Sequence, residues 1–199
     1  MRKLTAAIAA LVLAGTAAAA PAYAATEATG QGSSFAGKRI TQCAASYTDN
    51  KITYTPNSSG TGRKALTAGS VDFAGSDAAY GLKAEETASA VNVAVTGGPV
   101  TFAYNVPGVS NLNVSSALLS DIYTGKITNW NDAAIKKLNK SARLPNLPIV
   151  IVYRSKDSGT SQNLTDWLKQ TNPSKGWSVN GYFAQANTTK LPATAIGAG

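Results

Sequence analysis

The feature that most constrains the fold is a set of three short clusters rich in serine and glycine. The clusters are residues 32–34, 58–60 and 158–160, and each stands at the start of a helical pattern. A short polar turn between a strand and a helix is typical of α/β proteins, and serine is a preferred residue at helix N-termini. The sequence therefore predicts strand–turn–helix units in an α/β fold.

The periodicity of the rest of the chain extends this prediction. We expect helices over residues 35–48, 63–66, 83–90, 115–123, 131–138 and 158–170, with Ser115 and Asn131 as N-caps. We expect strands over residues 51–55, 71–74, 91–96, 100–105 and 147–153, the last one apolar throughout and buried on both faces. Residues 192–199 are rich in glycine and alanine and show no closing element, so we expect the chain to stop within its second unit.

The N-terminal residues have the pattern of a cleaved export signal. Arg2 and Lys3 precede an apolar run over residues 4–20, and residues 22–24 read Ala-Tyr-Ala, the form of a signal-peptidase site. We expect cleavage after residue 24 and export to the periplasm, the cell surface or the medium. The apolar run is too short for a membrane anchor, and no cysteine follows the cleavage point to carry a lipid.

Charge and composition exclude several classes of function. The formal net charge is +8, and removal of Arg2 and Lys3 with the signal lowers it to +6. A positive field raises the encounter rate of anions, but no basic run with interleaved aromatics indicates a nucleic-acid partner. The chain has no histidine, which excludes Ser-His-Asp and Cys-His catalysis. Cys43 is the one cysteine, so no disulfide forms within the chain, and we expect it to be a small buried apolar residue.

The third serine-glycine cluster has the composition of an oxyanion site. It follows the apolar segment 147–153 and Arg154, whose planar guanidinium suits bidentate oxyanion binding. Ser158 and Thr160 add hydroxyl groups, Gly159 permits a close backbone approach, and the helix N-terminus offers free N–H groups. The alternative is an ordinary helix cap beside a surface arginine.

A carboxylate is expected at the same edge of the sheet. Asp77 follows the predicted strand over residues 71–74, and ligands of doubly wound sheets bind outside the carboxyl ends of the strands. A carboxylate accepts a hydrogen bond from a protonated oxyanion and repels a fully ionised one. Asp77 therefore predicts selectivity for an anion that carries a proton.

Six stretches, taken together and in order, carry a family resemblance: residues 30–35, 58–62, 71–78, 100–107, 119–132 and 147–160. The most specific are D-I-Y-T-G-K-I-T-N-W in the fifth and R-S-K-D-S-G-T in the sixth. Over about residues 30–180 the chain resembles the phosphate-binding protein of bacterial phosphate ABC transporters. This family commonly has an acidic residue and a glycine where Lys156 and Asp157 stand here.

The resemblance implies a two-lobed periplasmic-binding-protein clamp of the α/β class. Its first lobe would span residues 25–104 and its second, incomplete lobe residues 105–199. The implied phosphate-binding residues are Ser34, Phe35, Ser59, Asp77, Arg154, Ser158, Gly159 and Thr160. The implied partners are inorganic phosphate and a membrane permease, and we expect a monomer without a cofactor, metal ion or catalytic residues.

Other functions remain open at this stage. The chain could be a receptor for another oxyanion or an organic phosphate, which tight sulfate binding would indicate. It could be a secreted interaction module that keeps the fold and binds no anion. A secreted phosphoester hydrolase with a serine or threonine nucleophile is disfavoured, because no histidine or metal cluster is available to activate the nucleophile.

Overall fold

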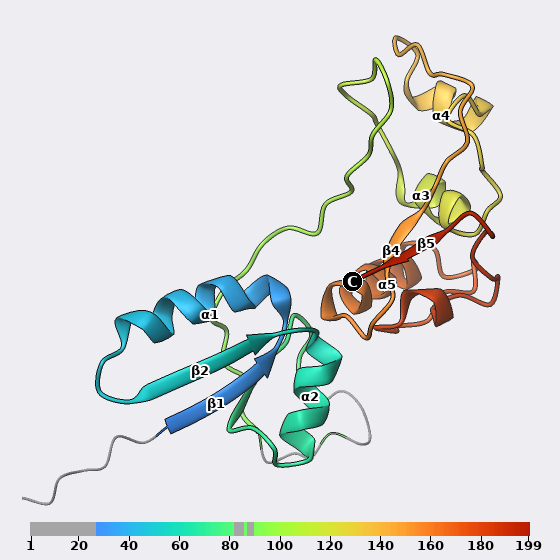
Figure 1. Ribbon diagram of the computed structural model, residues 1–199. Coiled ribbons are helices and arrows are strands. Elements are labelled where there is room, and N and C mark those ends of the chain that lie inside the picture. Colours follow the sequence, from blue (N-terminus) through green and yellow to red (C-terminus); the bar gives the residue numbers. More distant parts are fainter. Residues whose placement is uncertain (1–26, 82–85, 87–89) are drawn as a thin grey trace, which may run out of the picture.

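The structure is a computed structural model that describes residues 27–81, residue 86 and residues 90–199. Figure 1 shows two groups of helices and strands, which we call the first and second lobes, joined by a long extended segment. The first lobe comprises β1 (Glu27–Gly32), α1 (Ser34–Ser46), β2 (Lys51–Pro56), α2 (Ser59–Thr67) and β3 (Phe73–Gly75). The second comprises α3 (Ser116–Tyr123), α4 (Ala133–Leu138), β4 (Val152–Arg154), α5 (Gly159–Thr171), the 3-10 helix η1 (Phe183–Gln185) and β5 (Ile196–Ala198). The predicted α/β class is confirmed.

The first lobe is built on a parallel sheet with the strand order β2-β1-β3. Because the strands are parallel, their carboxyl ends share one edge, from which α1, α2 and Asp77 follow. Helix α1 packs against β2, and α2 packs against β1 and β3. Gly62 permits this approach, because a Cβ at that position would lie 2.5 Å from the carbonyl oxygen of Gln31. A side chain there would push the N-terminus of α2 away from the sheet edge.

The core of the second lobe consists of two apolar clusters. The first contains Leu118, Ile122, Ile127, Ile135, Ile149 and Ile151, and the second contains Leu168, Trp177, Phe183 and Ala186. Tyr123 joins them, since it packs on the first cluster and makes an edge-on contact with Phe183 at 5.0 Å between ring centroids. The buried indole N–H of Trp177 donates to Ser120 Oγ at 2.8 Å. These contacts pack the segment from α3 to η1 into one continuous core.

Side-chain caps explain where the α-helices begin. Ser33, Ser58, Ser115 and Ser158 are the N-caps of α1, α2, α3 and α5, and each hydroxyl accepts the backbone N–H three residues further on. The prediction of Asn131 as the cap of α4 is wrong, because Asp132 caps that helix. Asn129 shifts the start by one residue: its side-chain oxygen accepts the Asn131 N–H at 3.1 Å and holds residue 131 in the preceding turn.

The predicted strands over residues 91–96 and 100–105 are wrong. Both segments are described and form no regular secondary structure. A strand needs a neighbour that satisfies its backbone hydrogen bonds, and no described residue pairs with these segments. Val91 and Val93 are consequently 87% and 74% exposed. No prediction covered β1, whose sequence E-A-T-G-Q-G has few strand-forming residues.

The segment 147–153 and the C-terminus also differ from expectation. Only Val152 and Tyr153 of that segment belong to β4, and the segment is not buried on both faces: Ile149 and Ile151 are buried, whereas Val150 and Val152 are exposed. This alternation is that of a strand covered on one side. The prediction that residues 192–199 contain no element is wrong, because β5 pairs in parallel with β4.

Cys43 is exposed, so the prediction that it is buried is wrong. The reason is that α1 buries only Ala36 and Gly37. Cys43 lines a cavity of about 1070 Å³. This cavity lies between α1, the sheet and residues 90–100, and many of the side chains that line it are apolar. The apolar residue thus faces an open cavity and not the packed core.

Two sequence predictions fall outside the described residues. These are the export signal over residues 1–24 and the helix over residues 83–90, of which the structure describes residues 86 and 90 alone. In the part of the chain that is described, no helix combines the length and the apolar character that a membrane span requires.

Candidate anion-binding site

The N-termini of three helices meet where the two lobes touch. Helices α1 and α2 start at the carboxyl edge of the first-lobe sheet, and α5 of the second lobe comes against that edge at Gly159. A Cβ on Gly159 would lie 2.7 Å from Ser59 Oγ and 2.9 Å from Asp77 Cβ, so only glycine fits. The convergence places positive helix-dipole ends and first-turn N–H groups in one region.

Asp77 connects the two lobes at this point. Its carboxylate accepts the hydroxyl of Ser33 from the first lobe and, at 2.7 Å, the hydroxyl of Thr160 from the second. Its backbone N–H donates to Ser59 Oγ at 3.2 Å, and Asn163 Nδ2 donates to its carbonyl at 2.9 Å. The carboxylate therefore lies between the hydroxyl groups of Ser33 and Thr160, and the Ser59 hydroxyl of α2 contacts the backbone of the same residue.

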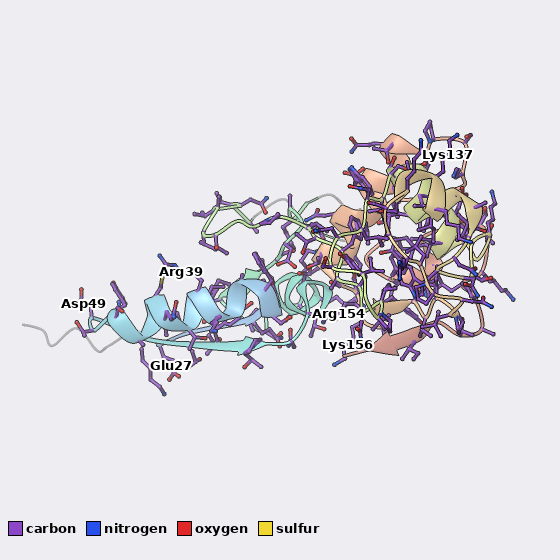
Figure 2. The ribbon with its side chains drawn as sticks, turned by 90° about the horizontal axis from the view of Figure 1, so that it is seen from above. Glu27, Arg39, Asp49, Lys137, Arg154 and Lys156 are labelled. Atoms are coloured by element: carbon purple, nitrogen blue, oxygen red, sulfur yellow. The ribbon has the colours of Figure 1, made fainter. Side chains whose placement is uncertain are left out.

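Arg154 reaches the same region from the end of β4. Its Nη1 lies 3.5 Å from Ser34 Oγ and its Nη2 lies 3.5 Å from the carbonyl oxygen of Asn57. Both distances are at the outer limit of a hydrogen bond, and the buried Nε has no partner among the described residues. Figure 2 shows Arg154 at the junction of the lobes, far from Arg39 and Asp49 on the first lobe. A loosely held guanidinium beside two helix N-termini is suited to an anion.

Unlike the side chains of Asp77 and Arg154, those of Ser158 and Phe35 form no hydrogen bond across the lobes among the described residues. The Ser158 hydroxyl caps α5 by accepting the N–H of Ser161 at 3.4 Å, and its own N–H donates to Gly181 at 3.0 Å. Phe35 is in the first turn of α1, where its backbone belongs to the helix N-terminus, while its ring is 53% exposed and lines the cavity beside α1. Six of the eight predicted residues thus contact one another across the lobes, and these two contribute through backbone or capping positions.

The predicted site residues omit Ser33 and Tyr54. Ser33 is buried, caps α1 and donates to Asp77. Tyr54 donates its hydroxyl to the Ser33 carbonyl at 3.0 Å. Burial and the nearby charge of Asp77 raise the pKa of Tyr54 to about 12. The cap pattern points to Ser33, whereas nothing in the sequence around residue 54 indicates that its side chain reaches this edge.

Asp157 has a different partner from the one that its position suggests. It stands close to Arg154 in the sequence, but its carboxylate lies 3.6 Å from Nη2 of Arg63, a buried residue of α2. Among the described residues, no side-chain carboxylate lies within ion-pair distance of Arg154. Within the described part of the chain, the guanidinium of Arg154 is therefore not paired with a side-chain carboxylate, while Asp157 belongs to a separate network around Arg63.

Two α/β lobes with three helix N-termini converging between them have the architecture of the two-lobed periplasmic-binding-protein fold. The sequence matches the family described as PBP superfamily domain over residues 15–198, and the chain belongs to this family. The match spans both lobes, which confirms the predicted family fold.

Relatives with a described function are similar to part of the chain. The chain is 38% identical over 150 residues to "Phosphate-binding protein PstS" of Pasteurella multocida, a match that covers 71% of this chain and 43% of the relative. It is 37% identical over 123 residues to "Phosphate-binding protein PstS 3" of Mycobacterium leprae, covering 59% of this chain and 33% of that protein. The chain thus spans less than half the length of these curated relatives.

A solved structure supports the same fold. The phosphate-binding protein of Stenotrophomonas maltophilia superposes with a TM-score of 0.60 and 28% identity, over 87% of this chain and 54% of that one. The similarity therefore extends over nearly all of this chain and about half of the solved protein.

Proposed function

We propose that this protein is an extracytoplasmic receptor that binds inorganic phosphate between its lobes and delivers it to an ABC permease. The observation that carries this proposal is the meeting of Asp77, Arg154 and the N-termini of α1, α2 and α5 at the contact between the lobes. The relatives described as phosphate-binding proteins support the choice of ligand.

The residues have complementary roles in this proposal. Arg154 supplies the positive charge. The hydroxyl groups of Ser34, Ser59 and Ser158 and the backbone N–H groups of Phe35, Gly159 and Thr160 supply donors. The Asp77 carboxylate accepts a hydrogen bond from the P–OH group of monohydrogen phosphate. Because Ser33 and Thr160 both donate to Asp77, the carboxylate is fixed in orientation before it meets the ligand. Each lobe contributes part of the cage, so binding favours their closed arrangement.

Isothermal titration of the full chain with phosphate, and with sulfate as control, tests this function near neutral pH. We expect phosphate to bind and sulfate to bind far more weakly. Arg154→Lys should weaken phosphate binding roughly tenfold or more, since lysine loses the bidentate geometry. Arg143→Lys, at an exposed position of the second lobe, is the matched control and should bind normally. Tight sulfate binding would instead indicate a receptor for another oxyanion.

The receptor role includes two further proposals. We propose that it involves no catalysis, so a chromogenic phosphate ester should not be turned over; turnover that Ser158→Ala abolishes would contradict this. We also propose export by residues 1–24, with the receptor acting as a monomer. N-terminal sequencing of the secreted protein should begin at Ala25, and its mass in solution should be that of one chain.

A further inference from the structure

Arg63 contacts residues of both lobes. It lies on α2, and its side chain is 3% exposed. Its Nε is 2.8 Å from Glu86 Oε1, and its Nη1 donates to Ser76 Oγ at 3.0 Å. Its Nη2 donates to Gln162 Oε1 at 3.3 Å and lies 3.6 Å from Asp157 Oδ1, an ion-pair distance. All three guanidinium nitrogens therefore have partners, and two of these partners belong to the second lobe.

Three of the four partners, Ser76, Asp157 and Gln162, lie close in the sequence to residues of the anion site. Ser76 precedes Asp77 and shapes its turn, because its Oγ accepts the N–H of Ala78 at 3.2 Å. Asp157 precedes Ser158, the cap of α5, and its carbonyl accepts the N–H of Gly60 at 3.0 Å. Gln162 lies one turn into α5. A shift of Arg63 would therefore move groups on both sides of the site.

Arg63 and Arg154 differ in their pairing with carboxylates. Arg63 faces the carboxylates of Glu86 and Asp157, which neutralise its charge, and it therefore contributes little positive field to an anion. Arg154 has no carboxylate of a described residue at ion-pair distance and keeps its charge for the ligand. The network around Arg63 is thus suited to holding the lobes in register and not to binding the anion.

We propose that Arg63 is a positioning residue of the anion site: it holds residues 157–160 of the second lobe against Asp77 and the N-terminus of α2. The ligand part of this inference rests on the proposed function. The planar fork is essential, because one guanidinium contacts four side chains from different directions. A lysine carries the same charge but cannot reach all of them.

The test compares Arg63→Gln, Arg63→Lys and Gln162→Leu with the unaltered chain. Arg39→Gln, an exposed arginine on α1 far from the junction in Figure 2, is the matched control. The first readout is phosphate affinity by titration calorimetry. We expect losses of roughly tenfold for the two Arg63 variants and of a few-fold for Gln162→Leu, a size typical of residues that act through others. Arg39→Gln should not change the affinity.

The second readout needs no phosphate. The N–H of Gly60 crosses from the first lobe to Asp157, so its hydrogen exchange reports on the docking of the lobes. We expect Arg63→Gln to accelerate exchange at Gly60 while amides paired between β1 and β2 keep their protection. Gln162→Leu removes one hydrogen-bond acceptor of Arg63 and leaves every buried charge in place. Its Gly60 exchange therefore tests the inference even if Arg63→Gln does not fold.

The outcomes separate this inference from the proposed function. If the unaltered chain binds no phosphate, the receptor function fails, but Gly60 exchange still decides the role of Arg63. Normal Gly60 exchange in Arg63→Lys and Gln162→Leu would overturn the inference. Weakened phosphate binding with unchanged Gly60 exchange would also overturn it, since that result assigns Arg63 a purely electrostatic effect.

Discussion

In the proposed function, Asp77 is the residue that selects among anions, because an ionised carboxylate can only accept hydrogen bonds. Asp77→Asn replaces one carboxylate oxygen by an amide donor. We expect phosphate to bind more weakly and sulfate more tightly, so that the ratio of their dissociation constants falls at least about tenfold, as the change of one buried hydrogen bond implies. Titration calorimetry with both anions measures this ratio. Asp49→Asn, an exposed position near the end of α1 opposite the site, should leave it unchanged.

Tyr54 predicts a pH dependence of stability. Its pKa is raised from 10.0 to about 12, by burial first and by the charge of Asp77 second. A folded pKa above the unfolded one means that the stabilisation is complete below pH 10.0 and is lost as the pH rises through 12. Tyr54→Phe removes this contribution, so its free energy of unfolding should fall less steeply over that window. Urea unfolding at several pH values tests this, with Tyr47→Phe as the control. Equal slopes in all three proteins would contradict the assignment.

At the scale of single elements, α4 offers a matched pair of substitutions. Ile135 is completely buried in the first core cluster, whereas Leu138 on the same helix is 41% exposed. Ile135→Ala should lower the free energy of unfolding by about 2–5 kcal/mol, because it removes buried methyl groups and leaves a cavity. Leu138→Ala should lower it by well under half of that amount. Chemical denaturation measures both values, and similar losses would mean that α4 does not anchor the core through Ile135.

The elements also show which structural features could be predicted from the sequence. Serine caps and local periodicity are properties of neighbouring residues, so α1, α3, α5 and the strand β2 agree with the prediction, and α2 is present but begins at Ser59, four residues before the predicted start. The strands over residues 91–96 and 100–105 were not, because an apolar alternating run becomes a strand only when another segment pairs with it. The strand β5 was missed for the opposite reason. Its Ile-Gly-Ala sequence does not indicate a strand, and the segment is extended because it pairs with β4.

The same distinction applies to the site. Asp77, Arg154 and the three turns could be predicted because each follows a strand or opens a helix, and parallel strands bring such ends together. Arg63 could not, because its partner Gln162 stands 99 positions away and its burial depends on the contact between the lobes. Its place four residues after Ser59 in α2 carries no information about the other lobe.

At the scale of the whole molecule, the two lobes differ in how completely they cover their apolar residues. The second lobe encloses two clusters, whereas the first leaves a cavity of about 1070 Å³ beside α1, lined by apolar residues such as Ile40 and Val93. Hydrophobic dyes bind to exposed apolar surface, and the lining of this cavity offers such a surface in the native state. We expect the folded chain to increase the fluorescence of anilinonaphthalene sulfonate before any unfolding.

Two substitutions locate the dye. Val93→Lys places a charge in the cavity at a position that is 74% exposed, so it should reduce dye fluorescence without loss of stability. Val179→Lys, in an exposed part of the second lobe away from this cavity, should not. Circular dichroism confirms that each variant is folded, and phosphate in excess separates the cavity from the anion site, since an anionic dye held by Arg154 would be displaced. Equal dye binding by both lysine variants would show that the cavity beside α1 is not the apolar surface that the dye meets.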